Sequence, residues 1–532
     1  MTKEILFGKD SRDKMLLGIQ KLANAVKVTV GASGKCVLIG EALYGNDGLV
    51  HLPTKVSKDG WTVCRYFSLP DVVENRGAMM LTEAATKTME TAGDATSCTI
   101  VLAEALITGG MKLIDEGANS QQLKKGMDAA LAYVVDELKK ISIPVKGDIN
   151  RIRQVATVSA NNDEVIGNLI ADAYSKIGDD GTIDIEESTS GLTSVKISEG
   201  YKFDNGWVSP LFVNNPAKES CVFEDALILL YQKRILHHTQ IEKAVTLSLQ
   251  IGKPLLIICD DADEEGLAFL AMNNHAQKIR VCLVKAPFIG TDRLNAMEDM
   301  ALLTGATYVS DQRGVDIKQI GEQHLGKAKK VIITKGETII IGGNGDKSKI
   351  DAHVAGLKET ALAANTEEER YPIEKRIATI KGSIAVISVG AATQTELREK
   401  IDRVDDAVRA TKAAIAEGFV AGGGTAFTRI ASRNYGFVAK DAKSLGYNLV
   451  LNALESPLLQ ICENAGEDSA SILDKVLKSK GDYGYNVLTD SIEDMVQAGI
   501  IDSTKALRCA LTNAVSVAGM VLTSECSIIS TY

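Results

Sequence analysis

Two glycine-rich segments, each associated with an aspartate, have the residue types expected of a phosphate-binding site. Residues 93–99 (Gly-Asp-Ala-Thr-Ser-Cys-Thr) precede a long apolar stretch, and three glycines at 422–424 follow the acidic pair Asp405 and Asp406. Glycines, hydroxyls and backbone amides at a helix N-terminus can bind an anion, and a nearby carboxylate suits a phosphate-bound Mg²⁺. Either segment alone is typical of an ordinary helix cap. Together they suggest a nucleotide site.

The segments that would position these residues change in character along the chain. The apolar pattern predicts helices over 11–30, with Ser11 as its cap, and over much of 74–139, with a short strand at 36–39. Long helices are expected again at 395–417, 424–433, 442–464 and 504–521.

Between about 199 and 384 the pattern becomes α/β. Short apolar runs typical of buried strands are separated mostly by helical or turn-rich stretches, at 227–231, 254–259, 281–286, 331–334 and 338–341. An α/β insert between two helical halves indicates a discontinuous domain. Hinges are expected where the character changes, at Pro144, Gly200, Gly382 and Gly418.

Composition excludes several classes of protein. A chain of 532 residues should form two to four domains, and its net charge of −10 argues against nucleic acid or an anionic membrane as a partner. The nine cysteines form no Cys-x-x-Cys, and the histidines include no His-Glu-x-x-His, so no zinc site is expected. The N-terminus lacks a signal-peptide core, and no segment reads as a membrane span. We expect a soluble, cytoplasmic protein.

The motifs, taken in order, resemble the group I chaperonins, the GroEL type of bacteria and organelles. The similarity runs from Lys3 to about Cys526 and rests on the segments 25–31, 58–60, 92–94, 158–161, 252–258, 284–287, 389–393, 417–424 and 483–486. It implies an α+β, multidomain, ring-forming chain. A mostly helical equatorial ATPase domain would comprise 1–141 and 417–532, a small α/β intermediate domain 142–198 and 385–416, and an α/β apical substrate-binding domain 199–384.

The resemblance also assigns roles in an ATPase site. Asp94 corresponds to the Mg²⁺ ligand, Asp59 to an acid facing the γ-phosphate, and Asp406 to the acid that orients or deprotonates the attacking water. Thr29, Lys58 and Ser97 correspond to contacts of a monovalent cation, K⁺ in this family. The remaining ATP contacts would be Val30, Gly31, Gly93, Ala95, Thr96, Cys98, Val158, Gly423, Asn486, Val487 and Asp502.

Considered singly, several of these residues have simpler explanations. Asp94 could be a helix cap, Lys58 a surface lysine, and Asp59 with Gly60 a hairpin turn. The chain also departs from the family pattern, because Ala95 replaces a glycine and Cys98 a hydroxyl. Asp59, Asp94 and Asp406 are all present, so hydrolysis is expected to survive with altered affinity or rate.

The insert carries the residues that the resemblance implies for binding non-native polypeptides. They are apolar and comprise Trp207, Leu211, Phe212, Ile241, Val245, Leu267, Ala271 and Met272. An apolar stripe at helical spacing more often packs in a core, and only the resemblance favours a client surface. Glu242 is acidic where the family is usually aliphatic, which affects the expected binding of clients and of a GroES-like co-chaperonin lid.

The resemblance implies a homo-oligomeric, heptameric ring. The acid of a family ion pair between rings is kept as Asp468, but Leu459 replaces its arginine, and Glu116 replaces a small alanine at the other contact. A second ring should therefore be weakly held or dynamic. Two alternatives to an ATP-driven folding chamber remain. One is an ATP-independent holdase or ring scaffold. The other is a small-molecule kinase or ligase, disfavoured because no Walker A spacing is present.

Overall fold

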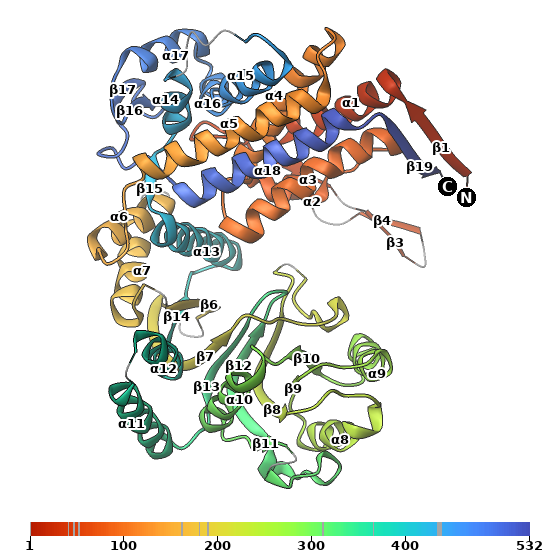
Figure 1. The fold of residues 1–532 in the computed structure, drawn as a ribbon, viewed down its shortest axis with the longest axis vertical. Helices are drawn as coiled ribbons and strands as arrows, with labels where there is room; N and C mark the ends of the chain where they lie inside the picture. Colours follow the sequence, from red (N-terminus) through yellow and green to blue (C-terminus); the bar gives the residue numbers. More distant parts are fainter. Residues whose placement is uncertain are drawn as a thin grey trace. The chain divides into compact units, whose positions relative to one another are not determined.

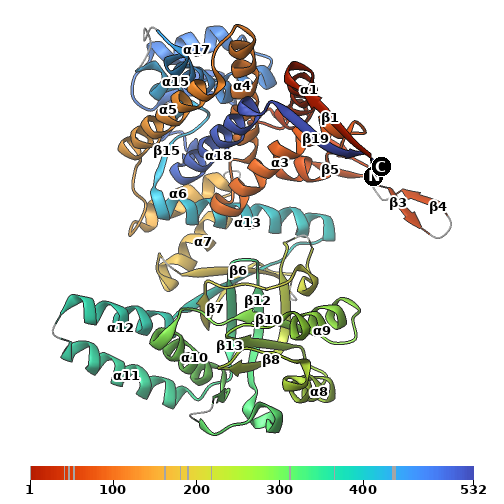
Figure 2. The same ribbon diagram turned by 45° about the vertical axis from the view of Figure 1, so that its right-hand side comes forward.

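The computed structural model describes residues 2–40, 42–45, 48–51, 54–160, 163–179, 181–188, 191–216, 218–310, 313–364, 366–433 and 439–531. The chain forms two compact units. We call Met1–Asp172 with Ala391–Tyr532 the helical unit, and Ala173–Gly390 the sheet unit (Figures 1 and 2). The α/β insert expected from the sequence thus forms a unit of its own. The finer division into equatorial, intermediate and apical domains stays a prediction.

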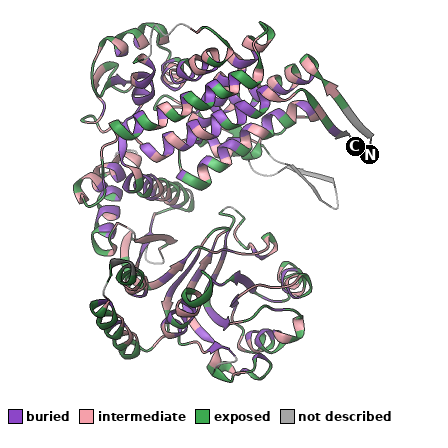
Figure 3. Ribbon diagram, viewed as in Figure 1, coloured by how far each residue is buried: buried purple, intermediate pink, exposed green. Residues whose placement is uncertain are grey.

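The helical unit is built around long helices from both ends of the chain. They are α1 (Gly8–Lys27), α3 (Val72–Ala92), α4 (Thr96–Asp115), α5 (Ser120–Ile141) and α18 (Thr504–Thr523). Their apolar faces form one buried core (Figure 3). Strands β1 (Thr2–Phe7) and β19 (Cys526–Thr531) pair antiparallel, so the two ends of the chain lie together (Figure 1).

Two of these helices correct an expectation from the sequence. Both α4 and α18 are long and apolar enough to cross a membrane by length and composition, whereas the sequence was expected to hold no such segment. Their apolar windows are 50% and 72% buried within the protein. Their hydropathy is therefore that of helices packed in a protein core.

Shorter elements complete the helical unit. The helices are α2 (Gly60–Tyr66), α6 (Ile149–Ser159), α7 (Glu164–Ile177, which extends into the sheet unit), α13 (Gln394–Glu417), α14 (Thr425–Ser432), α15 (Ala442–Ala453), α16 (Ser456–Ala465) and α17 (Ser469–Lys478). Four antiparallel strand pairs accompany them: β2 (Val37–Ile39) with β5 (Lys55–Ser57), β3 (Ala42–Gly45) with β4 (Gly48–His51), β15 (Phe419–Ala421) with β18 (Ile501–Ser503), and β16 (Tyr483–Asn486) with β17 (Ser491–Asp494).

Two helix predictions were wrong in detail. The helix expected over 442–464 is divided into α15 and α16, because Pro457 lies in the first turn of α16 and has no N–H to continue the ladder. Helix α1 begins at Gly8, three residues before the expected cap Ser11. The Ser11 side chain is buried, and its hydroxyl lies 2.6 Å from that of Ser527 next to the β1–β19 pair.

The sheet unit contains one mixed sheet of nine strands. Their order is β10 (Val281–Lys285), β9 (Leu255–Cys259), β8 (Cys221–Tyr231), β12 (Gly326–Ile333), β13 (Thr338–Gly343), β7 (Ser194–Phe203), β14 (Ser383–Val389) and β6 (Thr182–Glu187), with β11 (Tyr308–Val309) beside β8. Strands β8 to β11 pair in parallel, and every residue of β9 is buried. This explains the uninterrupted apolar runs seen in the sequence.

Among the described residues, the α-helices that lie wholly within the sheet unit are α8 (Glu242–Ile251), α9 (Glu264–His275), α10 (Gly290–Thr304), α11 (Lys347–Ala363) and α12 (Glu367–Ile380). A buried ionic cluster connects α10, α11 and α12. The Asp299 side chain is 1% exposed and accepts from Arg376 Nε at 2.6 Å and Nη2 at 2.8 Å. His353 Nε2 lies 3.0 Å from the same carboxylate. The buried Asp299 carboxylate is therefore paired with side chains of the two neighbouring helices.

Candidate functional site

The turn between α3 and α4 has the backbone conformation of an anion-binding loop. Gly93 (φ 75°) and Ala95 (φ 65°) both adopt the left-handed conformation, and a Cβ on Gly93 would lie 2.8 Å from that of Arg409. The Ala95 N–H donates to Asp94 Oδ1 at 2.5 Å. None of the described side chains caps α4, so Asp94 does not have the simple capping role left open by the sequence. The first amides of α4 thus remain available to a ligand.

Buried hydrogen bonds hold the start of α4 in place. The Thr99 hydroxyl donates to the Ala95 carbonyl at 3.0 Å and lies 3.0 Å from the Thr88 hydroxyl, which accepts from Asn513 Nδ2 at 2.9 Å. These residues join α4 to α3 and α18 beneath the glycine turn. Sequence reasoning assigned no role to Thr88 or Asn513, although polar residues at buried positions of apolar helices are a signal that could have identified them.

Asp59 caps α2 and does not form the hairpin turn that its sequence allows. Its carboxylate accepts from Trp61 N at 3.3 Å, Thr62 N at 2.8 Å and the Thr62 hydroxyl at 2.6 Å. The adjacent Gly60 is buried, and a Cβ there would lie 2.1 Å from Ser97 Oγ. The start of α2 therefore packs directly on the first turn of α4, with the Asp59 side chain exposed to solvent.

Asp406 lies on α13, whose Arg409 packs against Gly93 and forms an ion pair with Asp405 at 2.7 Å. The pKa of Asp406 is raised to about 7. The protein around its carboxyl is the main cause, although the side chain retains access to solvent, and the charges of Asp94, Asp405 and Asp59 follow. An acid that titrates near neutral pH suits proton transfer to or from water.

Two further carboxylates belong to this group. The surrounding protein and the charge of Asp59 raise the pKa of Asp94. Burial and the charge of Asp94 raise the pKa of Asp502 to about 7. Asp502 lies in β18, where its backbone pairs with Val420 of β15. The structure thus brings Asp59, Asp406 and Asp502, from three separate segments, close enough to Asp94 for the negative charges to repel.

A cation would relieve this repulsion, but the described residues supply no complete metal centre by themselves. Within the part of the chain that the structure describes, no group of three or more His, Cys, Asp or Glu side chains could hold a metal ion. Magnesium commonly takes only one or two protein carboxylates and completes its shell with water and phosphate oxygens. The arrangement therefore suits a metal that arrives with a phosphate ligand.

The loop after α1 lies within reach of Lys58. Gly31 adopts φ 81°, and the Lys58 amine donates to the Ala32 carbonyl at 3.2 Å. Thr29 is buried, and its hydroxyl donates to the Val26 carbonyl at 2.7 Å, as in a helix end. Asn464 Nδ2 donates to the carbonyls of Lys27 and Val30 at 2.7 and 2.9 Å. Sequence reasoning missed this asparagine, which contributes from a distant helix.

A third glycine turn precedes α14. Gly423 (φ 63°) and Gly424 (φ 77°) are left-handed, and a Cβ on Gly423 would lie 3.0 Å from Met495 Cε. The next hydroxyl, Thr425 Oγ1, is buried and has no hydrogen-bond partner among the described residues. Asn486 lies on the neighbouring hairpin β16–β17 and is 8% exposed.

The remaining predicted contacts are positioned less specifically. Val487 packs against a small core cluster of the helical unit. Val158 lies 3.2 Å from the Cβ position of Gly499, two residues before β18. Asn161, part of the motif at 158–161, lies outside the described residues. The burial of Thr96 and the half-burial of Ser97 and Cys98 place them in the packed first turn of α4, and burial with the charge of Asp502 raises the pKa of the Cys98 thiol.

Ala95 provides a test of backbone strain in the turn. The left-handed conformation destabilises an alanine by roughly 1–2 kcal/mol. Glycine avoids this strain but loses about 0.5–1 kcal/mol of stability, because its unfolded state has more conformational freedom. We expect Ala95→Gly to raise the free energy of unfolding by up to about 1 kcal/mol, measured by urea denaturation. The matched control is Ala129→Gly, at an exposed position in the middle of α5. Its free energy of unfolding should fall by about 1 kcal/mol. If Ala95→Gly lowers the free energy of unfolding as much as Ala129→Gly does, the backbone at Ala95 is not strained.

In the sheet unit, half of the predicted client-binding residues belong to the core. Phe212, Ile241, Val245 and Ala271 are at most 7% exposed, so their main role is packing. Trp207, Leu211 and Leu267 are half-buried against the same core, and the Trp207 Nε1–H donates to the Glu219 carbonyl at 3.1 Å. Met272 is 62% exposed on α9, and Leu249 is 55% exposed on α8. Only part of the predicted surface is therefore accessible.

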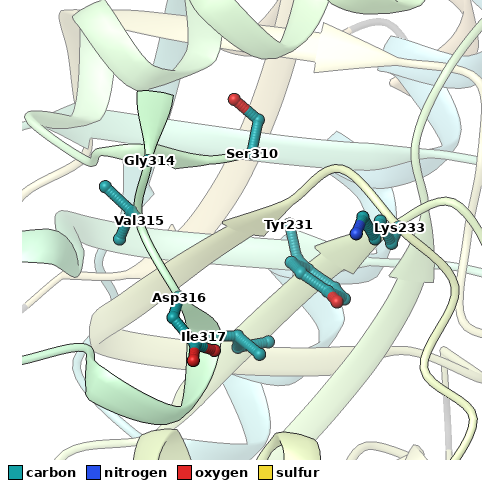
Figure 4. A pocket seen from close by; sticks show the side chains of 7 residues that line it. All are labelled: Tyr231, Lys233, Ser310, Gly314, Val315, Asp316 and Ile317. Carbon is teal, nitrogen blue, oxygen red and sulfur yellow. The ribbon is translucent and has the colours of Figure 1, made fainter. Parts of the chain in front are cut away.

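A cavity of about 280 Å³ also lies in the sheet unit (Figure 4). It opens beyond the carboxyl end of β8 and is lined by Tyr231, Lys233, Ser310, Gly314, Val315, Asp316 and Ile317. The Lys233 amine points toward the Tyr231 ring (Figure 4). None of these residues was predicted to bind nucleotide or client, and the cavity is separate from the carboxylate group of the helical unit.

Comparison with known proteins identifies the fold. Two crystal forms of the chaperonin gp146 from bacteriophage EL of Pseudomonas aeruginosa, both in the presence of ATP-BeFx, match 99% of this chain over 99% of their own. The TM-scores are 0.68 and 0.62, each at 22% sequence identity. The chain therefore has the multidomain chaperonin fold, with helical and α/β parts as predicted.

The sequence identifies the family. The model of the TCP-1/cpn60 chaperonin family matches residues 22–531, which is nearly the whole chain. The protein belongs to this family.

Proposed function

We propose that this protein is a divergent group I chaperonin that binds and hydrolyses ATP and uses it to promote the folding of non-native polypeptides. The convergence of Asp59, Asp94, Asp406 and Asp502 around glycine turns is the observation that carries the proposal. The related bacteriophage chaperonin has been crystallised in the presence of ATP-BeFx, which is consistent with it.

The residues present fit Mg²⁺-ATP. The first turn of α4, which no described side chain caps, offers amides to phosphate, and the Thr425 hydroxyl, which has no hydrogen-bond partner among the described residues, offers a polar group beside the glycine turn at Gly423. Asp94 is the residue that would hold Mg²⁺, with Thr29, Lys58 and Ser97 as contacts of K⁺. When bound, Mg²⁺ would neutralise charge on the phosphates.

The side chains then divide the remaining tasks. Asp406, with its pKa near neutral, would accept a proton from the attacking water, and Asp59 would orient that water from the start of α2. Asn486 and Val487 would contact the base and Asp502 the ribose, near Gly423. Because Asp406 and Asp94 belong to different elements, hydrolysis would depend on how α13 meets the α3–α4 turn.

We further propose the domain division implied by the family, with the sheet unit containing the apical domain and its client-binding surface. The exposed apolar side chains Met272 and Leu249, with half-buried Leu267, are the accessible candidates for contact with unfolded chains. The buried Phe212 is unsuitable as a test because its replacement would disrupt the core.

The client surface can be tested at α9. Combined Leu267→Ser and Met272→Ser should reduce binding of a denatured model protein by about tenfold or more, since each exchange removes roughly 1 kcal/mol or more of apolar contact. ATP turnover should stay within twofold. Binding would be measured by co-sedimentation. Leu362→Ser, which changes an 86% exposed side chain on α11, is the control and should bind normally. Unchanged capture by the double variant would contradict this surface.

Homo-oligomeric ring assembly is proposed on the same basis, with a cytoplasmic location and a GroES-like lid as candidate partner. Apolar side chains are exposed on paired strands of the helical unit: Ile5 opposite Ile528, and Leu38 opposite Val56. Exposed apolar pairs on short strands suit contact with another subunit.

Pairing of two heptameric rings should be weak. Asp468 caps α17 through the N–H groups of Ala470 and Ser471, Glu116 is exposed at the end of α4, and Leu459 offers no charge. One exposed ion pair is worth ~0–1 kcal/mol, repeated around the ring. Sedimentation velocity should show single rings in at least one of the apo, ATP and ADP states. Double rings in all three states, at nanomolar subunit concentration and high salt, would rule this out.

The proposed function is tested as a whole by refolding. The protein should raise the yield of a denatured model enzyme with ATP but not with ADP. An equal yield with both nucleotides would favour the ATP-independent holdase.

A further inference from the structure

The hairpin β16–β17 presents an acidic side chain on the same face as Asn486. The register pairs Gly484 with Glu493 and Asn486 with Ser491, so Gly484, Asn486 and Glu493 share one face of the hairpin. A Cβ on Gly484 would lie 2.0 Å from Thr425 Oγ1, so this face packs on the start of α14. Glu493 therefore lies on the side of the hairpin that meets the turn at Gly423.

Hydrogen bonds fix how Asn486 is oriented. Its Nδ2 donates to Glu493 Oε1 at 2.5 Å, and its Oδ1 accepts from the Leu488 N–H at 2.9 Å. The Thr489 hydroxyl donates to the same Oε1 at 2.9 Å. No described residue donates to Glu493 Oε2. The hydrogen bonds to Oε1 therefore leave Glu493 Oε2 able to accept a hydrogen bond beside the buried Asn486 amide.

Contacts that do not involve Glu493 also hold the hairpin in place. The Arg429 guanidinium donates to the carbonyls of Gly481, Ser479 and Tyr483 at 3.1, 2.7 and 2.7 Å, which anchors the segment that leads into β16. At the other end, the Tyr485 hydroxyl donates to Asp490 at 2.9 Å. Neither anchor uses the Glu493 carboxylate, whose Oε2 is therefore available to a ligand.

We propose that Glu493, acting with Asn486, selects a purine that carries an amino group at C6. The inference rests on the proposed nucleotide site and adds its base specificity. A carboxylate only accepts hydrogen bonds, so it pairs with the donating amine of adenine. A 6-oxo purine would present an oxygen to the carboxylate and leave two acceptors facing each other.

The experiment compares ATP with inosine triphosphate, which has oxygen in place of the C6 amine. Binding and steady-state turnover of both nucleotides would be measured for the wild type and for Glu493→Gln, whose amide can donate to O6. The ratio of kcat/KM for ATP over inosine triphosphate should fall by about tenfold or more in Glu493→Gln, through KM, because a hydrogen bond to a charged group is replaced. The kcat for ATP should stay within twofold.

Two further variants sharpen the result. Glu493→Ala removes the acceptor without adding a donor and should abolish the preference for ATP without reversing it. Glu463→Gln removes an exposed charge from α16 and should keep the wild-type ratio. If Glu493→Gln and Glu493→Ala weaken both nucleotides equally, or leave the ratio unchanged, the specificity role is wrong. If the wild type binds neither nucleotide, the proposed nucleotide site itself fails.

Discussion

Replacing Asp406 with alanine should slow ATP turnover by about 10²-fold or more while leaving ATP bound. Asp406 is the acid on α13 whose pKa is raised to about 7, and loss of a positioned general base commonly costs ~10²–10⁴ in rate. Single-turnover hydrolysis and nucleotide binding, measured on the same preparations, separate the chemical step from affinity. We expect the dissociation constant for ATP to change by less than about threefold, since removing a like charge from the acidic group does not remove a phosphate contact.

Asp94 should behave differently, because it is the residue proposed to hold Mg²⁺. Asp94→Ala should lose productive Mg²⁺-ATP binding as well as turnover. Asp402→Ala is the matched control for Asp406→Ala, because Asp402 is an exposed acid one turn before Asp406 on α13. Its turnover should stay within twofold of the wild type. Equal turnover in Asp406→Ala and the wild type would remove Asp406 from the mechanism and favour the scaffold alternative.

Breaking the buried ion pair between α10 and α12 should have the largest effect on stability. Arg376→Met leaves the Asp299 carboxylate, 1% exposed, without its two guanidinium hydrogen bonds. Because a buried charge that loses its partner typically costs ~3–5 kcal/mol, we expect the free energy of unfolding to fall by about 4 kcal/mol. The chain has two tryptophans, so a Trp61→Phe background leaves Trp207 as a fluorescent reporter of the sheet unit during urea unfolding.

Two comparisons identify the cause of that loss. Arg370→Met breaks an exposed pair with Glu374 on the same helix and should cost less than about 1 kcal/mol. The double variant Asp299→Leu/Arg376→Met removes both charges and should recover much of the stability lost by Arg376→Met alone. If Arg376→Met is as stable as Arg370→Met, the Asp299 carboxylate does not need its guanidinium partner for stability.

The sequence predicted the elements whose signals are local. Helix α13 was expected over 395–417 and spans Gln394–Glu417, because its apolar period is regular and Gly418 ends it. Strand β9, Leu255–Cys259, lies within the apolar run from which a strand was predicted at 254–259. The left-handed turns at Gly93 and Gly423 were also predictable, since glycine tolerates positive φ.

Features that depend on contacts between distant segments were not predictable in the same way. An apolar stripe does not reveal whether its face meets the core or the solvent, so Ile241 and Met272 were grouped together although one is buried and the other exposed. Asn464 and Asn513 have no local signal for their partners. The addition of β14 and β6 to one edge of the sheet likewise follows from long-range pairing.

The way in which the helical unit is assembled from both ends of the chain sets an order for folding during synthesis. Its core needs α18, made only after the whole sheet unit has been translated. The sheet unit is a continuous segment and can fold while translation continues, but α1, α3 and α4 must wait with their apolar faces uncovered. The chain therefore exposes, during its own synthesis, the kind of surface that its family recognises in others.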